Sequence, residues 1–560
     1  MASLTEAMSP MLLKWGIDAL QAGRPDAWLY LLSGAIVLVA AIGGLFRFWM
    51  RDVIVGTSRW IECDLRESFF THLLKLPPIF FDRNHTGDLM ARATDDVERV
   101  RMVLGPALLY AVNTNLTILF SGVMMFWVDF RLALILLILA PVVGATMLWV
   151  ARALHKANLR QQETYGALTT VVQENVSGIR VIKSYAREDY ETNRFAKVCK
   201  TYFQRSLRVA QLQALMFPLI TCLIGFGIAA ILWIGGKQVA AKEISLGSFI
   251  AFNGYLAIMT WPMIALGWVV HLYQRGAASH RRLTQVFEEE EQFDDLKTLG
   301  SSQSQHIIPD GAPEIRFDSI NFRYRPEGPD VLQNISFILP AGLTLAIVGQ
   351  TGSGKSTIAR LLTRLYEPQS GSISIAGVDW SSFSIEELRN VVSYVDQTPF
   401  LFSETIEGNI KFGKPEATDT QMEAAAYTAC FDKDIEQFPD RYRTRIGERG
   451  VTLSGGQQQR LTLARALVTD APVLLLDNSL SAVDANTEAE IIRRLRERTS
   501  GRTLLFITHR LAAAEMADLA AVIENGRLIE FGPPADLIAA GGVYARMYRR
   551  QRLAREIEEL

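Results

Sequence analysis

Residues 349–357 read Gly349-Gln350-Thr351-Gly352-Ser353-Gly354-Lys355-Ser356-Thr357, and they fit the phosphate-binding pattern G-x-x-x-x-G-K-[ST]. An apolar stretch over 343–348 predicts a strand before this loop, and residues 357–365 predict a helix after it. This order suits phosphate binding, because glycines let backbone N–H groups approach the oxygens and the helix N-terminus adds positive potential. We predict that Lys355 reaches the terminal phosphates and that Ser356 coordinates Mg²⁺.

Further motifs follow the loop at the ends of predicted strands and before predicted helices. They are Gln397 after the strand 391–396, Leu453-Ser454-Gly455-Gly456-Gln457 before the helix 458–467, Asp477 at the end of the strand 473–477, Ser481-Ala-Val-Asp484 after it, and His509 at the end of another strand. Their order and spacing resemble the nucleotide-binding domain of ATP-binding-cassette (ABC) transporters, over roughly residues 314–550. The resemblance implies an α/β P-loop NTPase cassette with a helical subdomain, which binds ATP and Mg²⁺.

The resemblance also implies roles for single residues. Tyr324 would stack on adenine, and His509 would contact the γ-phosphate. The Mg²⁺ and the attacking water would be bound by Gln397 and Asp477. Taken alone, Tyr324 fits an aromatic ring packed under a sheet equally well. A histidine at a strand end is also compatible with a structural role.

The Ser454–Gln457 segment is implied to act on a second domain. In the family two cassettes dimerise head to tail, so this segment covers the ATP that the opposite cassette holds. The Ser454 hydroxyl and the backbone amides of Gly455 and Gly456 lie at a predicted helix N-terminus, which suits a γ-phosphate. Each chain would therefore contribute half of two sites.

Asn478 follows Asp477 at the position where ATP hydrolysis needs a carboxylate. An ionised Glu can orient the attacking water and accept its proton, whereas an amide cannot, and a positioned base contributes ~10²–10⁴-fold in rate. The sequence therefore predicts a site that binds ATP but hydrolyses it slowly. His509 and Asp484 remain as residues that could give the water limited help.

The first half of the chain is predicted to cross a membrane. It holds five runs without Asp, Glu, Lys or Arg, each of 20 or more residues: Ala27–Phe46, Val103–Val128, Leu132–Ala151, Val209–Gly236 and Ile244–Gln274. About 20 apolar residues suffice for a bilayer-spanning helix, and five such runs make a soluble protein implausible. We therefore predict an all-α polytopic membrane domain before the cassette.

Charge placement predicts which loops face the cytoplasm. The segment 47–101 carries nine Lys/Arg and the segment 152–208 carries eleven, whereas 129–131 and 237–242 carry one and two. By the positive-inside rule the two long segments are cytoplasmic, and so is the cassette. The chain is thus expected to be a multi-pass protein of the plasma membrane, or of the inner membrane in a bacterium. Its net charge of −2 gives no reason to expect a nucleic-acid partner.

The arrangement resembles the transmembrane domain of ABC exporters, whose long intracellular loops meet the cassettes. Residues Pro77–Leu89, followed by Asp95-Asp96, are similar to the family's first such loop, and Glu174–Tyr185 to its second. Solvated helix pairs are the alternative. The family has six spans, so the sequence predicts a truncated first span near 5–14, within a membrane domain of 1–287. A polar linker is predicted at 288–313, before the cassette at 314–560.

Several polar and aromatic residues within the spans are candidates for lining a transport cavity, although such residues also join helices and anchor interfaces. They are Asn113, Thr114, Asn115, Thr117, Asn253, Thr260, Trp261 and Trp268. Because the five runs lack Asp, Glu, Lys and Arg, we expect coupling through ATP and no proton or ion relay. The resemblance implies export of a hydrophobic or amphiphilic substrate by alternating access.

Asn478 bears on the partner. A homodimer would have two weakened sites and slow turnover. A heterodimer avoids this, because the intact Leu453–Gln457 segment can complete a competent site on a second half-transporter that carries its own Glu. We therefore expect an asymmetric pair, while a slow homodimer and an ATP-gated channel or regulator stay open as alternatives. Non-transport cassette proteins of the DNA-repair or translation type lack membrane spans.

Overall fold

The computed structural model describes residues 1–291, 311–447, 453–498 and 501–558. It divides into two compact units. The membrane unit comprises Met1–Thr71 and Leu89–Glu288, and the cassette unit comprises His72–Asp88 and Glu289–Leu560. A helical membrane domain followed by an α/β cassette confirms the predicted fold class. The predicted linker at 288–313 lies mostly outside the described residues.

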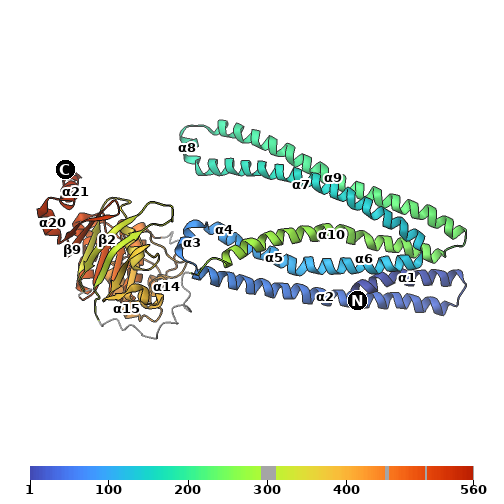
Figure 1. Ribbon diagram of the computed structural model, residues 1–560, viewed down its shortest axis with the longest axis horizontal. Helices are drawn as coiled ribbons and strands as arrows, with labels where there is room; N and C mark the ends of the chain where they lie inside the picture. Colours follow the sequence, from blue (N-terminus) through green and yellow to red (C-terminus); the bar gives the residue numbers. More distant parts are fainter. Residues whose placement is uncertain (292–310, 448–452, 499–500, 559–560) are drawn as a thin grey trace. The chain divides into compact units, whose positions relative to one another are not determined.

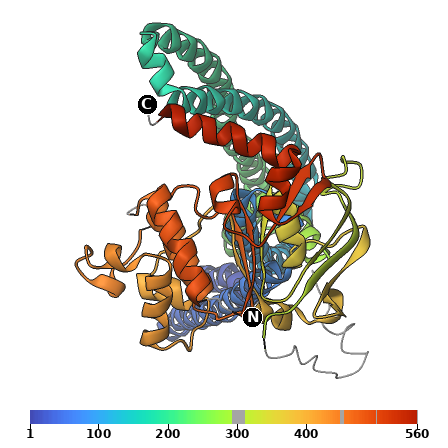
Figure 2. The ribbon, with the colours of Figure 1, turned by 90° about the vertical axis from the view of Figure 1, so that its left-hand side faces the viewer.

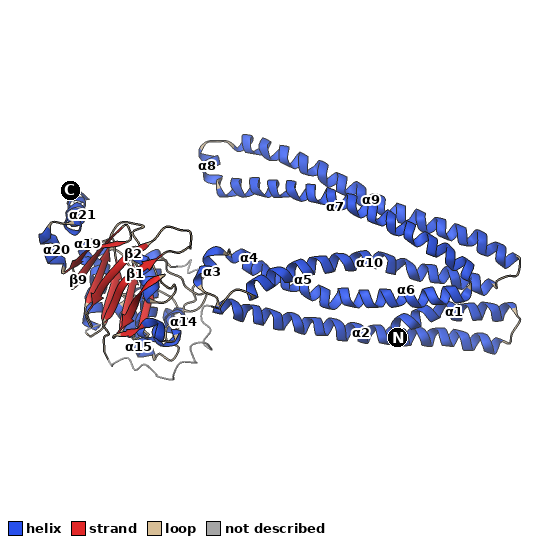
Figure 3. Ribbon diagram, viewed as in Figure 1, coloured by secondary structure: helices blue, strands red, loops and turns tan. Residues whose placement is uncertain are grey.

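Long helices make up the membrane unit (Figures 1 and 3). In chain order they are α1 (Ala2–Gln21), α2 (Asp26–Lys75), α4 (Thr86–Ala91), the π-helical turn η1 (Arg92–Asp96), α5 (Val97–Met102), the π-helical turn η2 (Val103–Ala107), α6 (Leu108–Val128), α7 (Phe130–Ser177), α8 (Ile179–Ser184), α9 (Glu188–Ala240) and α10 (Leu246–Phe287). The helices α7 and α9 run side by side, and α8 lies at the end where they join (Figure 1). The predicted second intracellular loop is therefore a helical hairpin.

Four helical stretches of the described chain are long and apolar enough to cross a membrane: Asp26–Lys75, Thr86–Val128, Glu188–Ala240 and Leu246–Phe287. Three of the five predicted runs lie wholly within these stretches, and a fourth, Ile244–Gln274, begins two residues before Leu246. The fifth run, 132–151, lies within α7. Asp129 and Ser245 cap α7 and α10, because each side chain accepts a hydrogen bond from the first turn, at 2.8 Å from Leu132 N–H and 3.0 Å from Ser248 N–H.

The N-terminal helix α1 is held by polar contacts to α6 and α10. The Tyr255 hydroxyl donates to the Ala7 carbonyl at 2.8 Å, and the Gly247 N–H donates to Asp18 at 3.2 Å. The Ser3 hydroxyl donates to the Asn113 side chain at 2.9 Å. Asn113, one of the candidate cavity residues, thus joins two helices within this unit.

Buried charges lie where α5 and its flanking π-helical turns pack on α10. The Asp96 carboxylate accepts hydrogen bonds from Ser279 at 2.9 Å and from Arg282 at 2.8 Å. Arg101 forms ion pairs with Glu62 and Glu98 and is 4% exposed. Each buried charge is therefore paired, as a desolvated charge requires.

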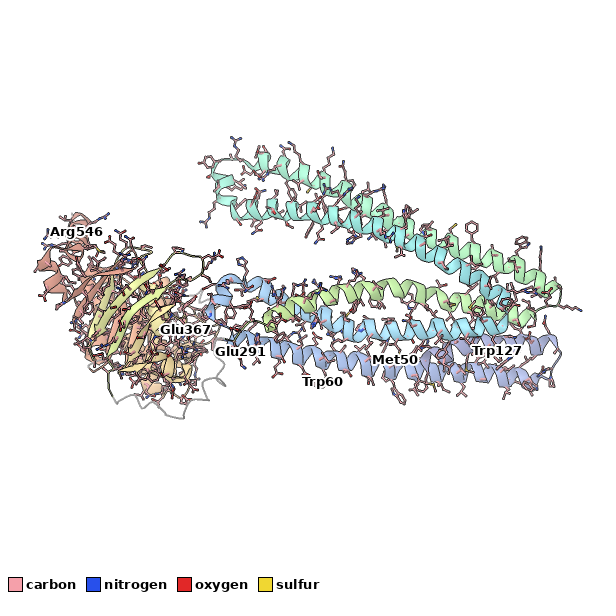
Figure 4. All side chains as sticks on the ribbon, viewed as in Figure 1. Met50, Trp60, Trp127, Glu291, Glu367 and Arg546 are labelled. Atoms are coloured by element: carbon pink, nitrogen blue, oxygen red, sulfur yellow. The ribbon has the colours of Figure 1, made fainter. Side chains whose placement is uncertain are left out.

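Large apolar side chains cover the outside of the helices. Trp60 projects from α2 away from the neighbouring helices and is 74% exposed (Figure 4). Trp127, near the end of α6, is 73% exposed. Trp127 lies at the end of the predicted run 103–128, where an exposed aromatic ring is expected at the membrane interface.

Two sheets organise the cassette unit. The first has the strand order β2-β1-β4-β5 and is antiparallel, with β1 (Ile315–Phe322), β2 (Leu332–Leu339), β4 (Ser370–Ile375) and β5 (Val378–Asp379). The second has the order β10-β9-β3-β8-β7-β6, with β3 (Thr344–Val348), β6 (Val392–Val395), β7 (Val473–Asp477), β8 (Thr503–Ile507), β9 (Leu519–Glu524) and β10 (Arg527–Gly532). All but β10 run parallel in this sheet. Both faces of its central strands are buried, which explains their continuous apolar sequences.

Helices cover the cassette sheets and form a helical subdomain after β6. They are α12 (Lys355–Leu362), α13 (Ile385–Val391), α14 (Ile406–Lys411), α15 (Asp419–Thr428), α16 (Asp432–Ile435), α17 (Gly455–Leu467), α18 (Ala485–Arg498), α19 (Leu511–Ala514), α20 (Pro534–Ala540) and α21 (Val543–Glu558), with short 3₁₀ turns at Trp380–Ser382 and Arg441–Arg443. The chain ends on α21, the red helix of Figure 2. The short helix α3 (Pro78–Arg83), from the predicted first intracellular loop, belongs to this unit as well.

Candidate functional site

Four parallel strands bring the predicted nucleotide residues to one edge of the second sheet. The strand β3 leads into Gly349, β7 ends at Asp477, and β8 leads to His509, while Gln397 follows β6 by two residues. Ligands of open parallel sheets bind beyond the carboxyl ends of the strands. The motifs that the sequence separates by up to 160 residues therefore meet at a place suited to binding.

The phosphate-binding loop joins β3 directly to α12, which begins at Lys355, two residues earlier than predicted. Gly354 has φ +99°, and a Cβ there would lie 2.7 Å from Leu332 and 2.9 Å from the Val331 carbonyl, so only glycine fits. The Lys355 ammonium donates to the carbonyls of Gly349 at 3.0 Å and Gln350 at 2.6 Å. Burial lowers the pKa of Lys355, and the nearby Asp477 carboxylate opposes this shift. The negatively charged oxygens of a bound phosphate would form an ion pair with the desolvated Lys355 ammonium.

Two oxygen donors suited to Mg²⁺ lie next to each other. The Ser356 hydroxyl donates to the Asp477 carboxylate at 3.0 Å, and Asp477 is 1% exposed. Burial raises the pKa of the Asp477 carboxyl, and the hydrogen bond from Ser356 opposes this shift without reversing it. Oxygen ligands, including carboxylates alongside substrate phosphates, are the ones that Mg²⁺ prefers. The donor set fits the metal, which would compensate the buried charge of Asp477.

Asn478 has a left-handed backbone immediately after β7. Its φ is +47°, a conformation that Asn adopts more readily than other residues with a side chain. The Asn478 N–H donates to the Ile507 carbonyl at 2.9 Å, which extends the pairing of β7 with β8. The half-buried side chain borders a hollow whose lining includes Ser481 and Arg510. The residue that replaces the expected Glu is thus fixed in place by its backbone.

His509 lies two residues beyond β8, the strand that pairs with β7. Partial desolvation lowers the pKa of His509, and the positive charge of Lys355 lowers it further. The imidazole is therefore neutral near pH 7, so it can donate one N–H to a phosphate oxygen.

The structure adds three residues around His509 that the sequence analysis missed. The Gln551 amide, on α21, donates to the His509 carbonyl. Arg510 forms an ion pair with Glu488 and donates to the Val483 carbonyl at 3.2 Å. These contacts are tertiary, and no local motif marks the residues that make them.

Tyr324 is held by other aromatic rings and by α12. Its ring meets those of Phe322 and Tyr366 edge-on, with centroids 4.8 Å and 5.1 Å away. Its hydroxyl lies 3.0 Å from the Thr357 hydroxyl and accepts from Arg360 at 3.3 Å. This cluster leaves the ring half-buried at the side of the phosphate-binding loop.

Tyr366 extends this cluster to the predicted first intracellular loop. Its hydroxyl donates to the Asp82 carboxylate at 2.5 Å. Asp82 lies on α3, within the same compact unit as the cassette. A chain of contacts therefore runs from Asp82 through Tyr366 and Tyr324 to α12.

The Ser454–Gln457 segment forms the N-terminus of α17, which begins at Gly455. The Ser454 hydroxyl accepts from Gln457 N–H at 3.3 Å, and the Gln457 side chain accepts from Ser454 N–H at 2.9 Å, which makes a capping box. A Cβ at Gly456 would lie 2.9 Å from the Ala482 carbonyl, so glycine is required for the approach of the Ser481–Asp484 segment. The capping box thus fixes the position and direction of the N-terminus of α17.

The remaining predicted residues lie in less constrained places. Gln397 is exposed, and its N–H donates to the Asp396 side chain at 2.7 Å. The Asp484 carboxylate accepts from Thr487 N–H at 3.0 Å, just before α18, and this bond is the main cause that lowers the pKa of Asp484. Asp484 therefore stabilises the start of α18 within its own chain.

Comparisons with known proteins agree with this geometry. Residues 1–263 match the family described as the ABC transporter transmembrane region, and residues 332–481 match the family described as ABC transporter. A protein described as a probable multidrug resistance ABC transporter ATP-binding/permease protein, YheI of Bacillus subtilis, is 37% identical over 98% of this chain and 93% of its own length. An ATP-dependent lipid A-core flippase of Photobacterium profundum is 34% identical over 96% of this chain and 90% of its own length.

A solved structure extends the similarity to the whole fold. It is a bacterial Atm1-family ABC exporter with ATP bound, which superposes with a TM-score of 0.78 at 27% identity and covers 98% of this chain and 95% of that one. The fold, the phosphate-binding loop and these relatives agree. This chain belongs to the ABC transporter family, as an exporter-type half-transporter that spans the membrane several times and carries its ATP-binding cassette on the cytoplasmic side.

Proposed function

We propose that this chain exports a hydrophobic or amphiphilic substrate as the ATP-retaining half of an asymmetric pair. The observation that carries the proposal is Asn478, which follows Asp477 in an otherwise complete nucleotide site. A partner half-transporter would supply the Glu that this chain lacks. The domain limits proposed for the two parts are 1–287 and 314–560, joined by 288–313.

The chain's own site would bind ATP tightly and turn it over slowly. Lys355 and the amides of residues 349–357 would hold the phosphates, Tyr324 would meet the adenine, and His509 would donate to the γ-phosphate. Mg²⁺ would be coordinated by Ser356, Asp477 and Gln397, and it neutralises phosphate charge when bound. An amide at position 478 cannot accept the proton of the attacking water, so hydrolysis here would lack its general base.

The same chain would complete the partner's site. Ser454 and the first amides of α17 would face the γ-phosphate that the partner holds, where a helix N-terminus stabilises negative charge. The capping box keeps this end of the helix fixed. Loss of the γ-phosphate would remove a contact shared by both cassettes, which is the differential interaction that a conformational switch needs.

The substrate class is inferred from the relatives and from the membrane unit. One relative is described as a multidrug resistance transporter and another as a lipid A-core flippase, and both descriptions point to amphiphilic molecules. The runs predicted to cross the membrane carry no Asp, Glu, Lys or Arg, which suits such a cargo.

Isolation of the complex tests the pairing. The tagged chain is purified in mild detergent from its native membrane, and the masses of the bound subunits are measured. We expect a 1:1 complex with a second half-transporter that carries Glu at the position of Asn478. A complex of two copies of this chain with rapid ATP turnover would contradict the proposal.

A further inference from the structure

The C-terminal helix holds the loop that carries His509. Gln551 lies on α21, and its side-chain N–H donates to the His509 carbonyl at 2.5 Å. The oxygen of the same amide accepts from the Leu511 N–H at 2.9 Å. One side chain therefore binds a peptide carbonyl and a peptide N–H on the two sides of Arg510. An amide side chain suits such a bridge, because it carries a donor and an acceptor on separate atoms.

The loop between β8 and α19 needs an outside partner at this point. Leu511 is the first residue of α19, where backbone N–H groups have no partner within the helix. Arg510, which precedes it, makes no side-chain capping hydrogen bond to that helix. The Gln551 oxygen takes the place of the missing cap, because it binds the first N–H of α19.

The helix that presents Gln551 is itself firmly anchored. The Tyr544 N–H donates to the Glu530 carboxylate at 3.0 Å, and the Tyr544 ring is fully buried. The Tyr548 hydroxyl donates to Glu515, just after α19, at 3.2 Å. Because α21 is fixed by two contacts to residues beyond the loop, the Gln551 bonds restrict the backbone of His509 and do not simply move with it.

We propose that Gln551 is a positioning residue for His509, which holds the imidazole where it recognises the γ-phosphate and so sets the preference for ATP over ADP. The inference rests on the nucleotide site proposed above, but it does not depend on an asymmetric pair. The influence of the Lys355 charge on His509 agrees with a ring held beside the phosphate-binding loop. Release of the loop would let the ring leave this place.

Two nucleotides that differ at the γ-phosphate test the proposal. Affinities for AMP-PNP and for ADP, both with Mg²⁺, are measured on the full-length chain in detergent. Gln551→Ala removes both bonds, and Gln551→Glu keeps the acceptor for Leu511 but places a carboxylate against the His509 carbonyl. We expect each variant to weaken AMP-PNP binding about five- to tenfold, since one or two hydrogen bonds are lost, and to change ADP binding less than about twofold.

A control and a double variant separate positioning from general stability. Arg546→Ala changes an exposed residue on the same helix (Figure 4) and should leave both affinities unchanged. His509→Ala should reproduce the selective loss, and adding Gln551→Ala to it should weaken AMP-PNP binding no further. An equal loss of both nucleotides, or full additivity with His509→Ala, would overturn the proposal. Wild-type chain that binds neither nucleotide would overturn the site itself.

Discussion

The backbone N–H of Asn478 donates to the carbonyl of Ile507 at 2.9 Å, so the residue after Asp477 is tied to the strand that leads to His509. The position where a general base is expected is therefore linked by one backbone hydrogen bond to the strand that precedes His509, the residue proposed to contact the γ-phosphate. Because an amide cannot act as a general base, we expect the side chain at position 478 to decide the rate of hydrolysis at this site.

Replacement of Asn478 by Glu is expected to raise hydrolysis at this chain's own site. The carboxylate would supply the missing base, and a gain of at least ~10²-fold is the order that such a base contributes. Glu tolerates a φ of +47° less well than Asn does, so we expect a loss of stability of about 1 kcal/mol. The measurement is ATP turnover of the purified chain, together with its thermal midpoint. Asn478→Gln has the same length without a carboxylate and should give no gain; an equal gain from both variants would contradict the assignment.

Removal of the Ser356 hydroxyl should weaken Mg²⁺ binding with nucleotide. Ser356→Ala deletes one oxygen ligand and leaves the buried Asp477 carboxylate without this donor. A hydrogen bond to a charged group contributes roughly 1.5–3 kcal/mol, so we expect at least about a tenfold rise in the Mg²⁺ concentration needed for ATP binding. Titration of Mg²⁺ at fixed ATP provides the measurement. ATP binding without metal should change little, because Lys355 remains, and an unchanged Mg²⁺ dependence would contradict the predicted ligand.

Stability should fall in acid partly through His509. Its pKa in the folded chain lies below the ordinary value of 6.5, so between the two values the unfolded chain binds more protons than the folded one. The contribution of His509 is complete above pH 6.5 and is lost as the pH falls towards the lower, folded pKa. We expect the thermal midpoint without nucleotide to decrease less between pH 7.5 and 5.5 in His509→Gln than in wild type. Equal decreases in both proteins would show that the ring is not desolvated.

We expect the hydrogen bond between Tyr366 and Asp82 to transmit the effect of nucleotide binding to the predicted first intracellular loop. Tyr366→Phe keeps the ring against Tyr324 but removes the hydroxyl that binds Asp82. We expect ATP affinity to stay within about twofold, while ATP turnover of the complex with its partner falls, because one hydrogen bond contributes about 1 kcal/mol. Asp82→Ala should lower turnover equally, and the double variant should add nothing. Additive losses would place the two residues in separate roles.

The parts of the site that could be predicted from the sequence are those formed by residues adjacent in the chain. Strand, loop and helix are contiguous around Lys355, and Asp477 ends a continuous apolar strand, so each could be placed from its neighbours. The sequence could not predict that α12 begins at Lys355 itself, because helix ends are set by capping and by packing. It also missed Gln551 and the pair of Tyr366 with Asp82, since these partners lie 42 and 284 residues away from the groups they bind. Such contacts depend on how helices pack, which no local pattern encodes.

The most direct test of an asymmetric pair is the ATP turnover of the co-purified complex after one substitution in the partner. The Glu that matches the position of Asn478 in the partner is changed to Gln, and steady-state hydrolysis is compared with the wild-type complex. We predict a loss of ~10²-fold or more, because the carboxylate that serves as general base in the partner's site would be gone. Turnover that stays near the wild-type level would contradict the account, since hydrolysis would then proceed at the site that carries Asn478.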